Sequence, residues 1–299
     1  MDNTLTFEFE SLVLPGLPLT ELGMSWEPDQ VSCSVVQDEL KITQELERIS
    51  EQILNKKKGA VNNATFNYRR AEVSQDRLRL EVGLSQYRYN LLHAAFEPGM
   101  VESHPEFLGQ MREQVRQEDL FDLDNLGGPL SSGVGITTVV VLADNLTVMI
   151  RRSNKVSMNA NLDHPALAEG VNPEEGLAGK IDLPSVAIRS AKEELNLPIE
   201  RKDVLFLGMC VDGRYWWPGI IAKVKVPFTW QEVRDRSEGA RDRWERDDIR
   251  FIPYTPEGIA DELRHAMEPG KGVTGFGSIA LLQAGIVDFG KEVMEKACH

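Results

Sequence analysis

Cysteine and histidine are scarce in this chain of 299 residues, which has three cysteines and five histidines. Cys33, Cys210 and Cys298 are odd in number, lie far apart and form no Cys-x-x-Cys pair. Reduced thiols in a cytosolic protein therefore fit better than a disulfide framework. The histidines show no spacing that is typical of a zinc site. No Ser-His-Asp or Cys-His arrangement can be read from the sequence, so catalysis by such a nucleophile is not predicted.

Positive charge is also in deficit, because 33 Lys and Arg stand against 47 Asp and Glu, for a net charge of -14. Such a surface repels phosphate polymers at long range, so we expect no nucleic-acid partner, although local arginines can hold a small anionic nucleotide. No run approaches the roughly 18 apolar residues of a membrane helix. The first ten residues lack the basic-then-apolar order of a secretory signal. We expect a cytoplasmic protein with no membrane partner, and the sequence indicates no oligomeric state.

Hydrophobic periodicity predicts both strands and helices along the whole chain. Residues 155–180 contain few apolar residues and are expected to form a long loop, which in a compact domain is usually functional. The segment 122–135 is rich in Asp, Gly and Ser, and we place a domain boundary there, between residues 1–130 and residues 131–299. Strands are predicted at 5–14, 66–73, 78–84, 137–142, 146–150, 204–211, 215–226 and 250–253, and helices at 39–57, 87–96 (a helix or a turn), 183–195, 257–267 and 278–284.

The most informative stretch runs from Arg189 to Leu197 and lies mostly within the predicted helix 183–195. At about 100° per residue, Ser190, Glu193 and Glu194 point the same way. An apolar stripe lies roughly opposite, so we expect the carboxylates to face away from the core and to be available to a divalent metal. That stripe consists of Ile188, Ala191 and Leu195. An isolated Glu-Glu pair is otherwise typical of a solvated helix face.

This stretch resembles the second half of the Nudix box, Gly-x5-Glu-x7-Arg-Glu-U-x-Glu-Glu-x-Gly-U, where U is aliphatic and the glutamates hold magnesium against a pyrophosphate. Ser190 stands where the family has its first helix glutamate. Ile181 stands where a glutamate is expected eight residues before Arg189, and an insertion of a few residues would explain this difference. Asn196 replaces the glycine, and it can adopt the left-handed conformation that a helix end requires.

A longer resemblance, from about Leu78 to about Gly285, is to an animal branch of Nudix enzymes that hydrolyse UDP-glucose and UDP-galactose to UMP and a sugar 1-phosphate. It implies an α/β/α Nudix sandwich with a mixed sheet, preceded by a smaller α+β N-terminal subdomain that recognises the substrate. The shared pieces, in order, are Gly83 to Arg88, Gly133 to Gly135, residues 139–153, Glu194 to Pro198, and Glu245 followed by Ile249 to Ile252.

The resemblance implies Mg2+ as cofactor, with Mn2+ as an alternative, because pyrophosphate hydrolysis needs neutralised phosphoryl charge and a positioned water. We expect Glu193, Glu194 and Glu245 to bind the metal, with Glu194 and Glu245 also catalytic. Glu245 would supply the charge that Ser190 lacks, although residues 245–248 also read as a charged turn. Arg189 is expected to orient Glu193 one turn on. Glu174 or Glu175 could add oxygen ligands.

Three residues outside the box are candidates for binding the substrate. Arg151 and Arg152 end a predicted strand, and because side chains alternate along a strand we expect only Arg152 to grip a phosphate, with Arg151 facing solvent. Tyr87 and Arg88 are expected to clasp the base or sugar, although a tyrosine after a strand is often packing.

The predicted function is thus a metal-dependent Nudix pyrophosphohydrolase acting on a small nucleotide-sugar, a UDP-sugar above others. Two alternatives stay open. One is a Nudix-fold nucleotide-binding protein with impaired catalysis, for which Ser190 and Ile181 are the evidence. The other is an active enzyme for a different substrate, such as ADP-ribose.

Overall fold

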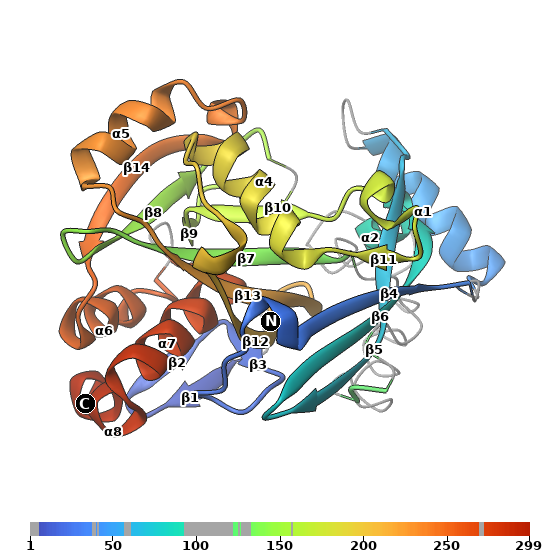
Figure 1. Cartoon of the computed structure of the whole chain (residues 1–299). Helices are drawn as coiled ribbons and strands as arrows, with labels where there is room; N and C mark the ends of the chain where they lie inside the picture. Colours follow the sequence, from blue (N-terminus) through green and yellow to red (C-terminus); the bar gives the residue numbers. More distant parts are fainter. Residues whose placement is uncertain are drawn as a thin grey trace.

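A mixed β-sheet forms the centre of the molecule in the computed structural model (Figure 1). Residues 6–37, 40, 42–56, 61–92, 122–124, 126, 133–156, 158–268 and 272–299 are described. The strand order is β14-β8-β7-β13-β12-β3, with β9 paired to β8 and β10 paired to β7. The β13–β7 pair is parallel and the others are antiparallel. The strands are β3 (Gly16–Pro18), β7 (Gly135–Val141), β8 (Leu146–Arg152), β9 (Asp163–Pro165), β10 (Leu167–Gly170), β12 (Val204–Asp212), β13 (Trp217–Lys225) and β14 (Arg246–Pro253).

Helices cover both faces of this sheet. Along β7, Val140 packs in one apolar core with Val186 of α4, whereas its neighbour Val139 packs in a second core with Ile279 of α7. This alternation is what a strand buried on both faces requires. The predicted α/β sandwich with a mixed sheet is confirmed. The helices are α4 (Leu183–Leu195) and α5 (Trp230–Glu238) on one face, and α6 (Pro256–Arg264), α7 (Gly275–Phe289) and α8 (Lys291–Cys298) on the other.

The N-terminal residues build a second sheet of four strands in the order β11-β4-β6-β5. Strands are exchanged between the two halves of the chain, because β3 pairs with β12 of the large sheet and β11 pairs with β4 of the small one. The division at residue 130 falls among residues 127–132, which lie outside the described part, and it stays a prediction. The elements are β1 (Phe7–Phe9), β2 (Leu12–Leu14), β4 (Val31–Val36), β5 (Ala64–Ser74), β6 (Arg77–Gln86), β11 (Lys180–Ile181), α1 (Gln44–Lys56) and α2 (Tyr87–Asn90), with short 3-10 turns η1 (Pro28–Gln30), η3 (Pro173–Gly176), η4 (Arg201–Asp203) and η5 (Arg243–Glu245).

The segment 155–180 is not the long loop that its composition predicts. Strands β7 and β8 share a single registered pair, Val141 with Thr147, and then separate. Strands β9 and β10 fill the space between them, joined at the buried Ala166, whose N–H donates to Val148 O at 3.1 Å. A polar segment can thus become sheet when two splayed strands leave backbone groups that must be paired.

Most other predicted elements are present, with shifted ends. The predicted strand 5–14 is a hairpin, because Glu10 has a positive φ of 55° and turns the chain between β1 and β2. Helices α5 and α8 were not predicted. The predicted helix or turn at 87–96 begins with α2, but residues 93–96 lie outside the described part. The three cysteines are buried and not paired with one another. None of the described helices is long and apolar enough to cross a membrane.

Helix α4 spans the predicted residues and ends as predicted. Asn196 adopts the left-handed conformation, with φ 54° and ψ 37°. Its N–H donates to Lys192 O at 3.1 Å, and the Leu197 N–H donates to Ala191 O at 3.0 Å. These bonds satisfy carbonyls that the helix end leaves unpaired, and they bring Leu197 back into the core.

We expect Asn196→Gly to keep the free energy of unfolding within about 0.5 kcal/mol of the wild type, and Asn196→Ala to lower it by about 1 kcal/mol. Glycine has no Cβ to crowd the left-handed backbone, whereas alanine has a Cβ and no side chain to bond locally. Urea denaturation followed by circular dichroism measures both. Equal stability of the Ala and Gly variants would contradict a strained position here.

Candidate metal and substrate site

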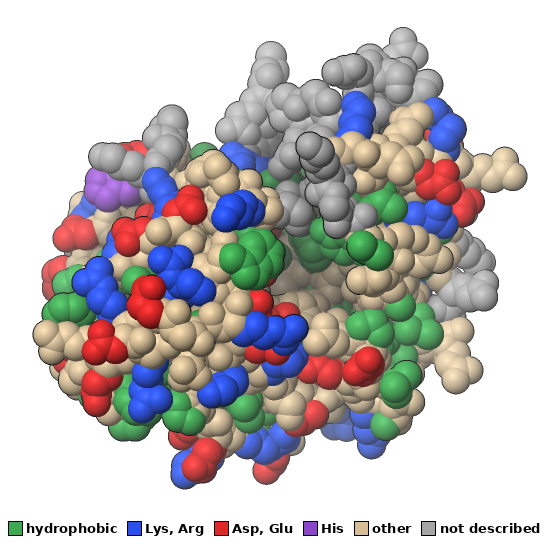
Figure 2. All heavy atoms as spheres, turned by 90° about the horizontal axis from the view of Figure 1, so that it is seen from above, with side chains coloured by type: hydrophobic (Ala, Val, Ile, Leu, Met, Phe, Trp, Pro, Cys, Tyr) green, Lys and Arg blue, Asp and Glu red, His purple; other side chains and the backbone are tan. Residues whose placement is uncertain are grey.

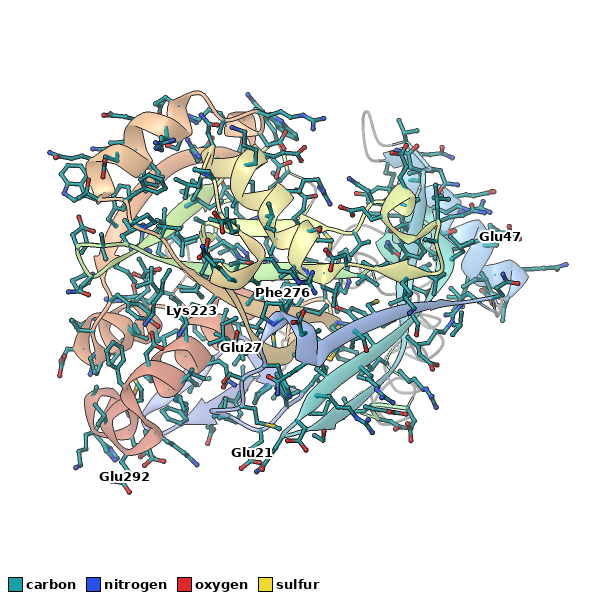
Figure 3. The ribbon with its side chains drawn as sticks, viewed as in Figure 1. Glu21, Glu27, Glu47, Lys223, Phe276 and Glu292 are labelled. Carbon is teal, nitrogen blue, oxygen red and sulfur yellow. The ribbon has the colours of Figure 1, made fainter. Side chains whose placement is uncertain are left out.

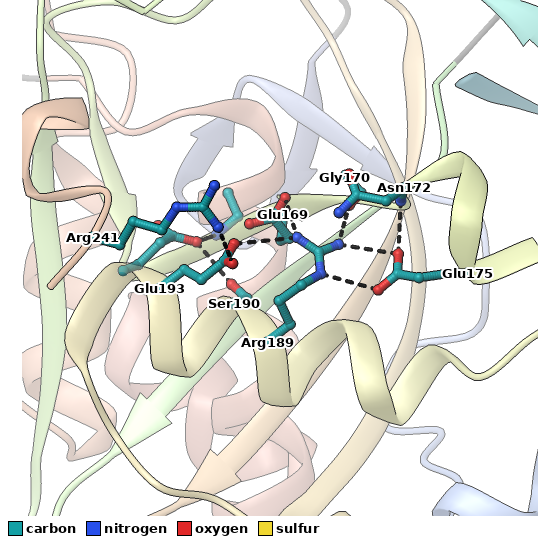
Figure 4. A network of polar contacts seen from close by, with 10 residues as sticks. Glu169, Gly170, Asn172, Glu175, Arg189, Ser190, Glu193 and Arg241 are labelled. Carbon is teal, nitrogen blue, oxygen red and sulfur yellow. Dashed lines mark hydrogen bonds and ion pairs between the residues drawn. The ribbon is translucent and has the colours of Figure 1, made fainter. Parts of the chain in front are cut away.

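Arg189 is the centre of a polar network that joins three segments of the chain (Figure 4). Its Nε lies 3.0 Å from Glu175 Oε1, its Nη1 lies 2.9 Å from Glu169 Oε1, and its Nη2 donates to Gly170 O at 2.7 Å. The predicted contact with Glu193 is present but is the longest, at 3.5 Å. Arg189 therefore positions carboxylates from β10 and η3 as well as from its own helix.

The stretched front half of the motif has a structural explanation. Ile181 occupies the expected glutamate position and is buried in the core, where it cannot serve as a ligand. Glu175 faces Arg189 instead, fourteen residues before it, and its Oε2 also accepts from Asn172 N at 2.7 Å. The residues inserted between Glu175 and α4 form a turn and the strand β11, which pairs with β4. Glu175 is thus committed to Arg189, and Glu174 is exposed.

Three carboxylates, from Glu169, Glu193 and Asp242, form a group that could hold a metal ion. One oxygen from each lies within 4.8 Å of the others. The group forms because Glu169 lies near the end of β10 beside Arg189, and because the Asp242 N–H donates to Glu193 O at 3.0 Å, which fixes the turn after α5 against α4. An all-carboxylate donor set fits a hard cation such as Mg2+ or Mn2+. Burial raises the pKa of Glu169, and the charges of Glu193 and Asp242 raise it further while Arg189 opposes them.

Of the predicted metal ligands, this group includes Glu193 alone. Glu194 is 7% exposed, and its Oε1 accepts from Ser190 Oγ at 2.8 Å and from Ala168 N at 2.9 Å. The expectation that the carboxylates face away from the core is wrong for Glu194, because β10 covers this side of α4. Burial raises the pKa of Glu194 well above its usual range, with Glu169 and Glu245 adding to the rise.

Glu245 lies beside this group, next to Arg152. The Ser153 N–H donates to Glu245 O at 2.8 Å, which fixes the start of β14 beside the end of β8. Burial raises the pKa of Glu245, Arg152 lowers it, and the charges of Asp242 and Glu169 raise it further. The structure therefore brings Glu245, Glu194 and Arg152 together at the edge of the metal group, while Asp247 and Asp248 are exposed.

The two arginines at the end of β8 point apart, as alternation requires. Burial lowers the pKa of Arg152, against the opposing charges of Glu245 and Glu194, and its Nε donates to Met158 O at 3.3 Å. Arg151 was expected to face solvent, but its Nη1 lies 3.0 Å from Asp163 Oδ1. That aspartate also pairs with Arg250, at 2.6 Å, so Arg151 belongs to a structural ion-pair network on the other side of β8.

A cavity of about 220 Å³ begins at this acidic edge and continues between the sheet and the start of α7. Figure 2 shows a hollow on this molecule, with acidic and basic side chains beside it and apolar ones at its rim. Arg152 and Glu169 line one part of the cavity. Three aromatic side chains line another part, and one of them, Phe276, lies near the middle of the molecule in Figure 3. The aromatic residues are Tyr215, Trp217 and Phe276.

Tyr87 and Arg88 do not line this cavity. The Arg88 guanidinium is held by Glu47, at 2.9 Å, and by Glu51, at 2.7 Å, both on α1. Figure 3 shows Glu47 toward the outer edge of the N-terminal part, away from Phe276. Tyr87 packs against a small apolar core that includes Ile49 and Ile53 of α1. Their role in substrate binding stays a prediction.

Sequence reasoning missed Glu169 and Asp242. Glu169 does lie within the segment 155–180, which was expected to be functional, and Asp242 lies three residues before Glu245. The sequence therefore gave a reason to consider each residue, but it did not predict that both would lie close to Glu193 in the folded chain.

No family model and no curated protein matches this chain. Among solved structures, a Deinococcus radiodurans protein overlaps 51% of this chain and 81% of its own, with 15% identity and a TM-score of 0.34. A MutT/nudix family protein from Enterococcus faecalis overlaps 54% of each chain, with 16% identity and a TM-score of 0.30. The T. brucei MERS1-RNA complex overlaps 55% of this chain and 57% of its own, with 16% identity and a TM-score of 0.28. These overlaps are too partial to decide a function, which must come from the site itself.

We expect Mg2+ to raise the Tm of the protein at pH 7 by about 5 °C when present at a hundred times its Kd, and Glu169→Gln to remove most of that rise. The amide keeps the shape of the side chain but cannot supply a charged ligand. Differential scanning calorimetry measures the change, and Glu174→Gln, at an exposed position, should respond to Mg2+ as the wild type does.

Without metal, the difference in stability between the wild type and Glu169→Gln should depend on pH. Because the pKa of Glu169 is raised, its carboxylate costs stability at neutral pH, and this cost disappears as the pH falls below that pKa. Glu169→Gln without metal should therefore be at least as stable as the wild type at pH 7, with an advantage that shrinks toward pH 4. A variant much less stable than the wild type at pH 7 would show that the carboxylates are a salt-bridge network and no metal group.

Arg241 forms an ion pair with Glu193 and would compete with a metal for its carboxylate. Its Nη1 lies 2.5 Å from Glu193 Oε1, and its side chain is 74% exposed. We expect Arg241→Ala to tighten Mg2+ binding about two- to fivefold, the range of an exposed ion pair, with less effect at high salt. Isothermal titration measures the Kd. Arg234→Ala removes the same charge from an exposed position on α5 and should change the Kd by less than twofold; equal effects would mean that net charge alone acts.

Proposed function

We propose that this protein hydrolyses the pyrophosphate bond of a nucleoside diphosphate-linked compound with a divalent metal as cofactor. The substrate we favour is a UDP-sugar, UDP-glucose or UDP-galactose, which would give UMP and a sugar 1-phosphate. The observation that carries the proposal is the position of the carboxylate group of Glu169, Glu193 and Asp242 at the edge of an aromatic-lined cavity. The resemblance to the Nudix box supports the reaction, and the longer resemblance supports the UDP-sugar.

The residues divide the work between holding the pyrophosphate and handling protons. Mg2+ or Mn2+ held by this carboxylate group would neutralise phosphoryl oxygens and lower the pKa of a bound water. Arg189 keeps Glu169 and Glu193 at the spacing that the group needs. Arg152, which lines the cavity beside the group, would donate to a phosphate oxygen through its terminal nitrogens, since its Nε is already bonded to Met158 O.

Glu245 is the residue we assign as proton acceptor for the attacking water. Two carboxylates flank Arg152, the buried Glu194 and the partly buried Glu245, but Oε1 of Glu194 already accepts two hydrogen bonds between α4 and β10. Glu194 therefore positions β10 on the helix, and Glu245 has the freer carboxylate. Burial raises the pKa of Glu245 toward neutral pH, above that of an exposed glutamate, and a general base works best with a pKa near the working pH.

The alternative of an impaired, binding-only protein rests on Ser190, and the local geometry weakens it. Ser190 is 1% exposed, and its hydroxyl donates to Glu194 rather than leaving an empty ligand position. The missing charge is supplied from elsewhere, by Glu169 and Asp242. The other alternative, an active enzyme for ADP-ribose, is tested by comparing the hydrolysis rates of ADP-ribose and of UDP-sugars.

We expect the purified protein to convert UDP-glucose or UDP-galactose to UMP with Mg2+ or Mn2+, and faster than it converts ADP-ribose or a GDP-sugar. Glu245→Gln should lower kcat about a hundredfold or more while KM changes by less than about threefold, because the base acts in bond breaking. Product formation is followed by chromatography, with EDTA as the metal-free reference. Asp247→Asn, an exposed carboxylate two residues away, is the matched control and should keep wild-type kcat.

The pH profile separates a catalytic base from a structural acid. In the wild type, kcat/KM should decrease when the pH drops below the raised pKa of Glu245, because the carboxylate is then protonated and cannot accept a proton. Glu245→Gln should lose that limb of the profile. Metal-independent hydrolysis, or a Gln variant with wild-type kcat, would exclude this mechanism; nucleotide binding without turnover would favour the binding-only protein.

A further inference from the structure

His164 in β9 carries a buried nitrogen that has no partner among the described residues. The side chain is 2% exposed and lines the cavity, and its Nε2 makes no hydrogen bond. An unpaired buried polar atom costs free energy comparable to a lost hydrogen bond, so such atoms are rare in folded proteins. A ligand bound in the cavity could supply the hydrogen bond that this buried ring nitrogen lacks.

The hydrogen bond of the other ring nitrogen, Nδ1, determines whether Nε2 carries a proton. His164 Nδ1 lies 2.5 Å from Thr274 Oγ1, and that oxygen also accepts from Gly277 N at 3.0 Å as the N-cap of α7. In the described part of the chain, Nδ1 is the acceptor that lies within reach of the Thr274 hydroxyl proton. The hydroxyl therefore donates to Nδ1, and the imidazole carries its proton on Nε2. His164 presents an N–H donor to the cavity.

The surroundings favour a neutral oxygen as the acceptor over a phosphate. Burial and the charge of Arg152 lower the pKa of His164 well below its usual range, so the ring is neutral and compensates no negative charge. The aromatic walls suit a flat ring. A volume of about 220 Å³ is below the roughly 300–1,000 Å³ of sites that enclose a whole drug-sized ligand, so it fits one ring system.

We propose that His164 is a specificity-determining donor that binds a keto oxygen of the nucleobase, so that the cavity selects bases with a ring carbonyl at this position over bases with an amine there. Uracil and cytosine form the matched pair, because at C4 uracil has a carbonyl where cytosine has an amine, with N3 beside it carrying a proton only in uracil. An amine facing the N–H would leave two donors unpaired in an apolar cavity. This inference rests on the proposed function only in assuming that the ligand is a nucleotide.

The test is binding of UMP and CMP by isothermal titration in EDTA, where neither the metal nor a scissile bond is present. We expect the wild type to bind UMP about tenfold or more tightly than CMP. His164→Phe, which keeps a flat ring but has no donor, should reduce this ratio to below about threefold. His164→Gln can present either an N–H or a C=O, so it should bind both nucleotides with similar affinity, and it serves if the Phe variant does not fold.

Thr274 supplies the matched control for the proton position. Thr274→Ser keeps the hydroxyl and should keep the UMP preference, whereas Thr274→Val removes it and should lose the preference even where circular dichroism shows a native fold. A wild type that binds UMP and CMP equally would overturn the proposal. So would equal losses for both nucleotides in His164→Phe, which would place His164 against the phosphate. Selective UMP binding without UDP-sugar hydrolysis would leave the proposal standing and reject the proposed function.

Discussion

The candidate site depends on one guanidinium, that of Arg189, which holds three carboxylates from three segments of the chain. Glu169 lies near the end of β10, Glu175 lies in η3, and Glu193 follows Arg189 by one helical turn. Carboxylates this close repel one another unless a cation lies among them. Burial would lower the pKa of Arg189, but the ion pairs outweigh it and raise the pKa, which shows how strongly these anions stabilise the charge. Arg189 thus already compensates part of the charge of Glu169 and Glu193, two of the three carboxylates that could hold a metal ion.

The sequence predicts the part of this arrangement that is local. Helix α4 follows from its apolar period, its end follows from Asn196, and the Arg189–Glu193 contact follows from one turn of spacing. The sequence does not predict that β7 and β8 separate to admit β9 and β10, because strand pairing depends on backbone groups distant in the chain. Glu169 reaches the site through that insertion, and Asp242 reaches it through a backbone bond to Glu193, so neither placement could be read from spacing.

The change at Ser190 illustrates why a motif position and a ligand position are different things. In the sequence, Ser190 is a lost carboxylate. In the structure its hydroxyl and the Ala168 N–H both bond Glu194, and this bond joins α4 to the inserted strand β10. A glutamate at this 1% exposed position would place a second buried charge beside Glu194. The carboxylates of Glu169 on β10 and of Asp242 in the turn after α5 lie at less buried positions than Ser190.

The position of these carboxylates gives the cavity an anionic edge and an apolar end, and the two parts would bind different groups of a ligand. Without a metal ion, the carboxylates of Glu169, Glu193 and Asp242 would repel a pyrophosphate despite the charge of Arg189, and the net charge of -14 would add to the repulsion. The aromatic end attracts an uncharged ring whether or not a metal is present. Under the proposed function, a nucleotide would therefore anchor its base first, and its pyrophosphate would bind only together with the metal. Charge would set this order, because the carboxylate edge would repel phosphates that arrive without a metal.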